Sequence, residues 1–388
     1  MVYRRRMPAR PRRLDEVPGF GIDRVAAAAG EDPAVLRLEN LDTDLPVPDG
    51  VVEATRAAVG DDEYNSYLPF TGRDDLKELI ARHMTARSGV EHAAGQVVIT
   101  LGEGDGMVDA LEATCDVGDE VILTDPTYAG MINRVRLAGC IPRLVPLEVV
   151  DGRWRLDLDA LAAAITPRTT ALFWQNPSFP AGFRMDDDEW AAVGRLCAEH
   201  DLWLLYLALF EGVVFDGAAP MHPGSVAGLA ERTVTIGSFS VEFRMIGWRV
   251  GWIAGPPETA ADLGLVHIYN GLTPGGIAMA GARAALQAPA GDLERCNAEW
   301  QRRRDAVLEQ CAGLPVVPAD GAWSMLLDCR ELGVEPDELS RRLIGHKVAA
   351  TPMGAWGGDV ARRHLRLVFS NERVERLQTL GERLRAAL

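Results

Sequence analysis

Lysine is almost missing from this sequence of 388 residues, since only two of its 40 basic residues, Lys77 and Lys347, are lysines. Acidic residues outnumber basic ones, and the formal net charge is −16. Nucleic acids and anionic membranes bind positive protein surfaces, so this charge disfavours both as partners. We expect a small molecule or another protein as the partner instead.

Patterns for metal binding and membrane crossing are missing as well. The six cysteines form no Cys-x-x-Cys pair and have no histidine at metal spacing, which predicts no metal site and a reducing compartment. No apolar run approaches the length of a membrane span. The basic segment 4–13 has no apolar stretch behind it, so we expect a solvated arm and a cytoplasmic protein.

Short apolar runs alternate with helical patterns between residues 50 and 285, which indicates a parallel sheet with crossover helices. The run 202–210 is almost wholly apolar, as in a central strand that is covered on both faces. Ligands bind at the carboxyl ends of such strands. The seven expected strands are 97–101, 120–124, 142–146, 170–174, 202–206, 233–236 and 250–254.

The sequence changes character after about residue 290. A charged amphipathic helix comes first, strand-like pieces follow at 322–328, 348–352 and 365–369, and a helical pattern closes the chain. This order is typical of a small α/β domain.

Six short segments stand in a fixed order along the chain. They are Tyr67-Leu-Pro-Phe-Thr-Gly72, Thr100-Leu-Gly-Glu-Gly-Asp-Gly106, Asp125-Pro-Thr-Tyr128, Asn176-Pro-Ser-Phe-Pro-Ala-Gly182, the segment 235–252 and His364-Leu-Arg-Leu-Val-Phe369. Together they resemble, in this order, segments of the class I/II aminotransferases, the pyridoxal phosphate enzymes of fold type I. The resemblance covers nearly the whole chain after about residue 35.

The resemblance implies an α/β fold of type I, with a large domain built on a mostly parallel seven-stranded sheet and a small α/β domain. We expect an N-terminal arm and part of the small domain in residues 1–45. The large domain would span residues 46–288, and the C-terminal part of the small domain residues 289–388. A homodimer is implied too, because the family's tyrosine at the position of Tyr67 reaches the neighbouring subunit's site.

The resemblance also assigns ligand contacts. Tyr128 matches the aromatic residue that stacks on the pyridine ring, and Asn176 matches the asparagine that hydrogen-bonds the phenolic oxygen. Arg249 matches the phosphate-binding arginine. Arg366 matches the arginine that binds the substrate α-carboxylate.

Departures from the family pattern concentrate at the cofactor. Val241, which follows Ser238 and Ser240, stands where the family has the lysine that holds the cofactor as a Schiff base. Leu207 replaces the aspartate that keeps the pyridine nitrogen protonated, and Phe210 lacks a hydroxyl often found beside the ring oxygen. We therefore expect a protein that has lost pyridoxal phosphate chemistry and uses no cofactor.

Two acids, Glu103 and Asp105, lie in the glycine-rich turn where the family binds phosphate. Either would repel a phosphate dianion, and one of them could pair with Arg249 in its place. The alternative is that both are ordinary acids in the first turn of a helix, where the helix dipole favours them.

The leading hypothesis is a biosynthetic enzyme that works without pyridoxal phosphate on an amino-acid-like or carboxylate-bearing small molecule. The reaction would be a cyclisation, isomerisation, dehydration or condensation, with Glu103, Asp105 or Tyr128 transferring the proton. Two alternatives stay open. One is a non-catalytic homologue that binds a metabolite or a partner, and the other is an enzyme that holds the cofactor without a covalent bond.

Substrate contacts complete the hypothesis. Arg366 and Arg249 would bind the carboxylate-bearing molecule, and Asn176, Tyr128 and Tyr67 would line the cleft.

Overall fold

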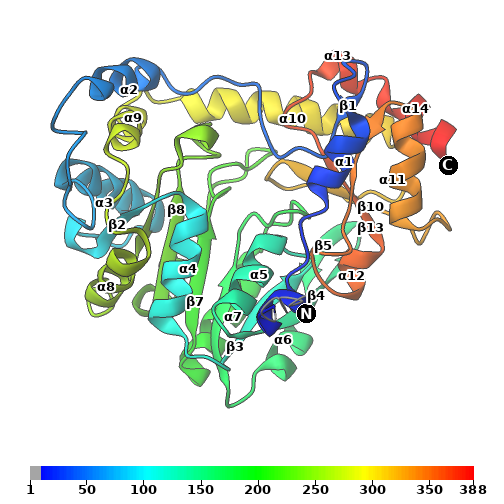
Figure 1. Cartoon of the computed structure of the whole chain (residues 1–388). Helices are drawn as coiled ribbons and strands as arrows, with labels where there is room; N and C mark the ends of the chain where they lie inside the picture. Colours follow the sequence, from blue (N-terminus) through cyan, green and yellow to red (C-terminus); the bar gives the residue numbers. More distant parts are fainter. Residues whose placement is uncertain (1–9) are drawn as a thin grey trace, which may run out of the picture.

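The computed structural model describes residues 10–388; residues 1–9, which hold most of the expected basic arm, lie outside the described part. The chain folds around an eight-stranded sheet with the strand order β2-β9-β8-β7-β6-β3-β4-β5 (Figure 1). The strands are β2 Val97–Thr100, β3 Glu120–Asp125, β4 Ile141–Val150, β5 Arg153–Leu156, β6 Thr169–Trp174, β7 Trp203–Ala208, β8 Thr233–Ser238 and β9 Gly251–Ala254.

Parallel pairing dominates the sheet, since β4, β3, β6, β7 and β8 all run in one direction. Strand β9 pairs antiparallel with both β8 and β2, and β5 pairs antiparallel with β4. The prediction of a mostly parallel α/β sheet is confirmed, but the number of strands is eight instead of seven. The extra strand, β5, follows β4 through the turn Asp151-Gly152, in which both residues have positive φ, as a tight hairpin requires.

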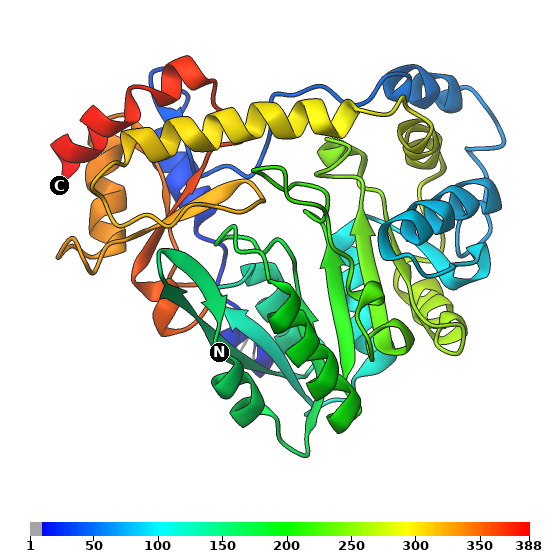
Figure 2. The same ribbon diagram turned by 180° about the vertical axis from the view of Figure 1, so that it is seen from behind.

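Helices cover both faces of the sheet. In the view from behind, α7 lies across the sheet, while α4 and α5 lie on the other side (Figures 1 and 2). The longer helices of the large domain are α3 Asp74–Ser88, α4 Glu103–Thr114, α7 Asp187–His200, α8 Ala260–Gly271 and α9 Gly276–Leu286. Shorter helices are α2 Val51–Val59, α5 Ala129–Leu137 and α6 Leu158–Ala164.

Segments near both ends of the chain build the smaller unit. Its three-stranded sheet has the order β10-β13-β12, and a two-stranded sheet pairs β1 with β11 in parallel. The strands are β1 Leu36–Arg37, β10 Ser324–Asp328, β11 Val348–Ala349, β12 Thr351–Pro352 and β13 His364–Val368. The helices are α1 Ile22–Ala29, α10 Asp292–Gln310, α11 Pro336–Gly345, α12 Asp359–Arg362, α13 Val374–Leu377 and α14 Leu380–Ala387.

Two links tie the N-terminal segment to this unit. Leu36 pairs with Val348, and the Val368 amide donates to the Leu38 carbonyl at 2.9 Å. Helix α10 crosses the top of the molecule from the large sheet to the small one (Figure 1). The exact domain boundaries stay a prediction. Among residues 10–388, no helix is both long and apolar enough to cross a membrane.

Candidate active site

An anion-binding cup lies at the start of α4 and the end of β8. The Ser238 hydroxyl donates to Glu103 Oε2 at 2.7 Å, and the Ser240 hydroxyl lies 3.2 Å from the same oxygen. Arg249 Nη2 lies 3.7 Å from Glu103 Oε2, and Arg249 Nη1 donates to the Ser240 hydroxyl at 3.3 Å. The four side chains form one cluster, in which the carboxylate of Glu103 is the anion. The structure thus brings Glu103 to Arg249.

The backbone at Gly102 lets Arg249 approach the start of α4 closely. Gly102, which precedes α4, has φ +82° and ψ 179°, a conformation open almost only to glycine. A Cβ atom at Gly102 would lie 2.6 Å from Arg249 Nη2, so a side chain there would displace the guanidinium. Glycine at this position therefore lets the arginine reach the start of the helix.

Aromatic rings surround Tyr128, which caps the start of α5. Its ring stacks on Phe20 at a centroid distance of 5.9 Å and an interplanar angle of 14°. Phe179 and Trp356 lie 6.2 and 5.8 Å from the same ring. Burial raises the pKa of the Tyr128 phenol. The tyrosine is therefore part of an aromatic wall and is held in its protonated form at neutral pH.

Arg366 in β13 is fully buried beside this wall. Its guanidinium carbon lies 4.5 Å from the Trp356 ring centre and 5.1 Å from that of Phe179. Nη2 donates to the Glu39 carbonyl at 2.5 Å, but within residues 10–388 Nε and Nη1 have no hydrogen-bond partner. Burial lowers the pKa of Arg366 to about 9. A buried guanidinium with free donors is costly unless an anion completes it, so this side chain indicates a carboxylate ligand.

Asn176 is held in place by the backbone around it. Its side-chain oxygen accepts from the Met185 amide at 2.9 Å, and its carbonyl accepts from the Tyr206 hydroxyl at 3.0 Å. The side-chain oxygen already accepts the Met185 amide, so we expect the NH2 group of the Asn176 amide to be the part that contacts a ligand.

Three apolar side chains stand at positions where the sequence pattern predicts contacts with a cofactor. Val241, Leu207 and Phe210 are all buried, and Phe210 stacks on Phe179 at 5.7 Å. Both lysines of the chain are paired elsewhere. Lys77 lies 2.8 Å from Asp74, and Lys347 lies 2.9 Å from Asp32.

Asp105 and Tyr67 are among the predicted site residues that are not brought into the cup. Asp105 accepts from the Leu101 amide at 3.0 Å and lies 3.6 Å from His267, in a cluster with Asp109. Asp109 accepts from His267 at 2.8 Å, so this cluster is a hydrogen-bond network, and the expected lack of a metal site stays a prediction. The ring of Tyr67 is 81% exposed.

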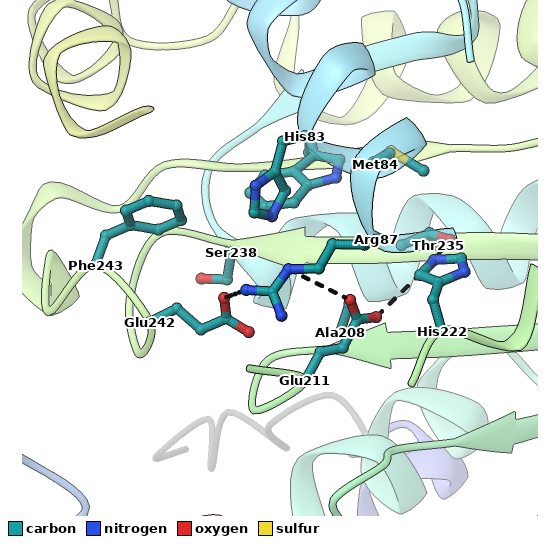
Figure 3. Close-up of a pocket in the computed structure, with 11 residues that line it drawn as sticks. His83, Met84, Arg87, Ala208, Glu211, His222, Thr235, Ser238, Glu242 and Phe243 are labelled. Atoms are coloured by element: carbon teal, nitrogen blue, oxygen red, sulfur yellow. Dashed lines mark hydrogen bonds and ion pairs between the residues drawn. The ribbon is translucent and has the colours of Figure 1, made fainter. Parts of the chain in front are cut away.

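A polar pocket near the cup was not predicted. Arg87 from α3 lies between Glu242 and Glu211, at 2.9 and 4.0 Å (Figure 3). Burial, followed by the charge of Glu242, raises the pKa of Glu211 to about 8, whereas burial lowers the pKa of His222 to about 3. The sequence offers one signal for this pocket, since Glu211 and Glu242 directly follow Phe210 and Val241.

The cup lies at the carboxyl end of β8, so the protein is of the α/β class whose candidate ligand site lies at the strand ends of a mostly parallel sheet. A family model described as "Aminotransferase class I and II" matches residues 35–384. The chain belongs to this family.

Curated relatives in the family have named activities. The chain is similar to the arginine–pyruvate transaminase of Pseudomonas aeruginosa, with 32% identity over 345 residues that cover 87% of this chain and 86% of the relative. It is 30% identical to the aspartate/prephenate aminotransferase of Thermus thermophilus, over 95% of this chain and 90% of the relative.

Solved structures show the same fold over nearly the whole chain. The N-succinyldiaminopimelate aminotransferase from Mycobacterium tuberculosis superposes with a TM-score of 0.91 at 27% identity, and covers 98% of this chain and 100% of its own. The Thermus thermophilus aspartate aminotransferase solved with maleate has a TM-score of 0.90 at 28% identity, with the same coverage.

These comparisons correct the expected function. The hypothesis of an enzyme without pyridoxal phosphate chemistry, and the cyclisation, isomerisation, dehydration or condensation attached to it, is wrong, because the relatives are named aminotransferases. The expectation of no cofactor is wrong for the same reason, since the family points to pyridoxal phosphate. The physical weakness of the hypothesis is that it depends on a few positions, chiefly Val241 and Leu207. Hydrogen bonds and stacking from several other residues also hold such a cofactor.

Apart from Glu103, the residues of the cup and the wall fit the non-covalent contacts of pyridoxal phosphate. Ser238, Ser240 and Arg249 offer the hydroxyl and guanidinium donors that a phosphate needs, and Tyr128 offers an aromatic face. Asn176 offers the NH2 end of its amide. The side chain of Val241 carries no amine, so position 241 itself offers no covalent anchor.

Proposed function

We propose that the protein binds an amino acid or a 2-oxo acid through Arg366 and acts on it as an aminotransferase. The observation that carries the proposal is a fully buried guanidinium whose Nε and Nη1 have no hydrogen-bond partner within residues 10–388. A carboxylate matches these donors in charge, because its oxygens accept charge-assisted N–H bonds. The names of the relatives favour amino-group transfer as the reaction.

Pyridoxal phosphate is the cofactor that this proposal implies. When bound, it supplies the carbonyl that accepts the amino group and the ring that takes up electrons. Ser238, Ser240 and Arg249 would hold its phosphate, while Tyr128 would face its ring.

Proton transfer is the role that Val241 cannot fill. We propose Tyr128 and Glu103 for this role. Glu103 lies in the cup, and the charges of Glu103 and Arg249 act on the Tyr128 phenol. Asp105 is a weaker candidate, since it points to His267 instead.

Amino-group transfer can be measured directly. Purified protein with added pyridoxal 5′-phosphate would be given a panel of amino acids and either pyruvate or 2-oxoglutarate, and products would be followed by mass spectrometry. We expect a new amino acid in the wild type and at least about a tenfold loss of rate in Arg366→Lys. If amino acids bind without any transfer, the reaction is overturned; if none binds, the role of Arg366 is overturned as well.

We also propose a homodimer located in the cytoplasm. Tyr67 and Phe70 on one segment, and Tyr269 and Leu272 on another, expose large apolar side chains. The two segments are joined by the hydrogen bond from the Thr273 hydroxyl to the Leu68 carbonyl at 3.3 Å. Exposed apolar patches of this kind mark association surfaces. Light scattering after size-exclusion chromatography tests the proposal, and a mass of 42.1 kDa, that of one chain, would contradict it.

A further inference from the structure

The anion cup already holds an anion that belongs to the chain. Glu103 is the first residue of α4, and its side chain is only 15% exposed. Its Oε2 accepts from Ser238 at 2.7 Å and lies 3.2 Å from the Ser240 hydroxyl. The nearest guanidinium atom of Arg249 is 3.7 Å away.

A serine hydroxyl has one proton to donate. While Ser238 and Ser240 both donate to Glu103, neither can donate to a phosphate oxygen at the same time. The guanidinium of Arg249 is shared in the same way, because its Nη1 also bonds the Ile246 carbonyl at 2.9 Å. Glu103 therefore uses the donors that an incoming phosphate would need.

Charge acts in the same direction as hydrogen bonding. A phosphate in the cup would lie next to the Glu103 carboxylate. Two neighbouring negative charges repel each other strongly in a partly desolvated site. A phosphate can enter only if the carboxylate moves out of the cup or takes up a proton.

We propose that Glu103 is a specificity-determining residue. Its carboxylate occupies the anion cup, and a phosphorylated ligand must displace this carboxylate. The inference rests on the proposed function, since it concerns how the same cleft takes its cofactor. It predicts that phosphate-bearing ligands bind more weakly than the cup's donors would otherwise allow. Ligands without a phosphate are not affected.

The test compares binding of three probes to the full-length protein by isothermal titration. The probes are inorganic phosphate, pyridoxal 5′-phosphate and pyridoxal, which has the same ring without the phosphate. Glu103→Gln removes the charge at nearly constant shape, and Glu103→Ser also removes the bulk. Glu112→Gln is the matched control, because Glu112 lies on the same helix and its side chain bonds Asn270 instead.

We expect both Glu103 variants to bind the two phosphate-bearing probes at least about tenfold more tightly than the wild type. Affinity for pyridoxal, and all affinities of Glu112→Gln, should change by less than about threefold. A crystal structure of Glu103→Gln soaked in phosphate should place the ion within hydrogen-bond distance of Ser238, Ser240 and Arg249.

Equal affinity of the wild type and both folded Glu103 variants for phosphate and pyridoxal 5′-phosphate would overturn the inference. So would a lack of binding in all of them. Titration with amino acids separates this inference from the proposed function. If Glu103→Gln binds phosphate more tightly but no amino acid binds to the protein, the role of Glu103 in the cup is supported and the role of Arg366 is overturned.

Discussion

The Trp356 ring contacts both Arg366 and Tyr128, with its centre 4.5 Å from the Arg366 guanidinium carbon and 5.8 Å from the centre of the Tyr128 ring. Its indole N–H donates to the Phe20 carbonyl at 3.0 Å, which fixes the plane of the ring. One aromatic side chain therefore positions both the proposed carboxylate-binding arginine and the tyrosine of the aromatic wall.

Replacing Arg366 with lysine should weaken binding of amino acids and 2-oxo acids by about ten- to a hundredfold. Lysine keeps a charge but loses the planar fork that a carboxylate matches, and its ammonium is harder to bury. Isothermal titration measures the change. Arg376→Lys is the control, because that arginine bonds Glu372 and carbonyls of the smaller unit. Unchanged affinity in folded Arg366→Lys would remove this residue from the substrate site.

Replacing Val241 with lysine tests the alignment of the cofactor segment. A lysine there should become covalently joined to pyridoxal phosphate, and borohydride should fix the label in the peptide that contains residue 241, as seen by mass spectrometry. Val241→Met, of comparable length but without an amine, is the matched control and should carry no label in that peptide. A label fixed equally on Lys77 or Lys347 of the wild type would show that the anchor lies elsewhere.

The stability of the protein should depend on Glu211. Its folded-state pKa of about 8 lies above the ordinary value of 4.5, so the folded protein binds more protons than the unfolded chain between these pH values. The free energy of unfolding should therefore fall as pH rises through this window, by up to about 1.4 kcal/mol per pH unit.

Glu211→Gln should flatten that fall, because glutamine stays neutral. Urea unfolding at several pH values between 5 and 8 measures it. Glu258→Gln, at an exposed position, should leave the slope as it is. An identical slope in Glu211→Gln and the wild type would contradict a raised pKa in the folded state.

Gly102→Ala should lower the free energy of unfolding by about 1 to 3 kcal/mol, because the backbone there is in a conformation that other residues rarely adopt. It should also weaken the pairing of Glu103 with Arg249, since the new Cβ would lie 2.6 Å from Arg249 Nη2. Thermal unfolding measures the first effect. Gly95→Ala is the control, as a Cβ at Gly95 meets nothing within 4 Å and its φ is not positive.

Local patterns in the sequence predict much of the fold. The strand 202–206 was expected from its apolar run, and β7 covers Trp203–Ala208. The eighth strand was missed because only alternate residues of the segment Arg153–Leu156 are buried, so it has no continuous apolar run. Its position depends on pairing with β4, which a single strand pattern does not reveal.

The cup was predictable because its residues stand in two short motifs. Ser238, Ser240 and Arg249 lie within one segment, and Glu103, for which the sequence suggests a pairing with Arg249, lies 3.7 Å from that arginine. The direction of Asp105 could not be predicted, because it depends on His267 from α8, a distant part of the chain. The loss of aminotransferase function was wrongly inferred, because single positions such as Val241 and Leu207 say little about contacts spread over many residues.

The guanidinium of Arg366 donates to the carbonyl of Glu39, although 327 positions separate the two residues. During synthesis the ribosome must therefore finish almost the entire polypeptide before this contact can form. A proteolytic fragment limited to residues 46–288 would retain the cup but would lack both Arg366 and Glu39. Such a fragment should not bind amino acids, because the proposed carboxylate-binding guanidinium is gone.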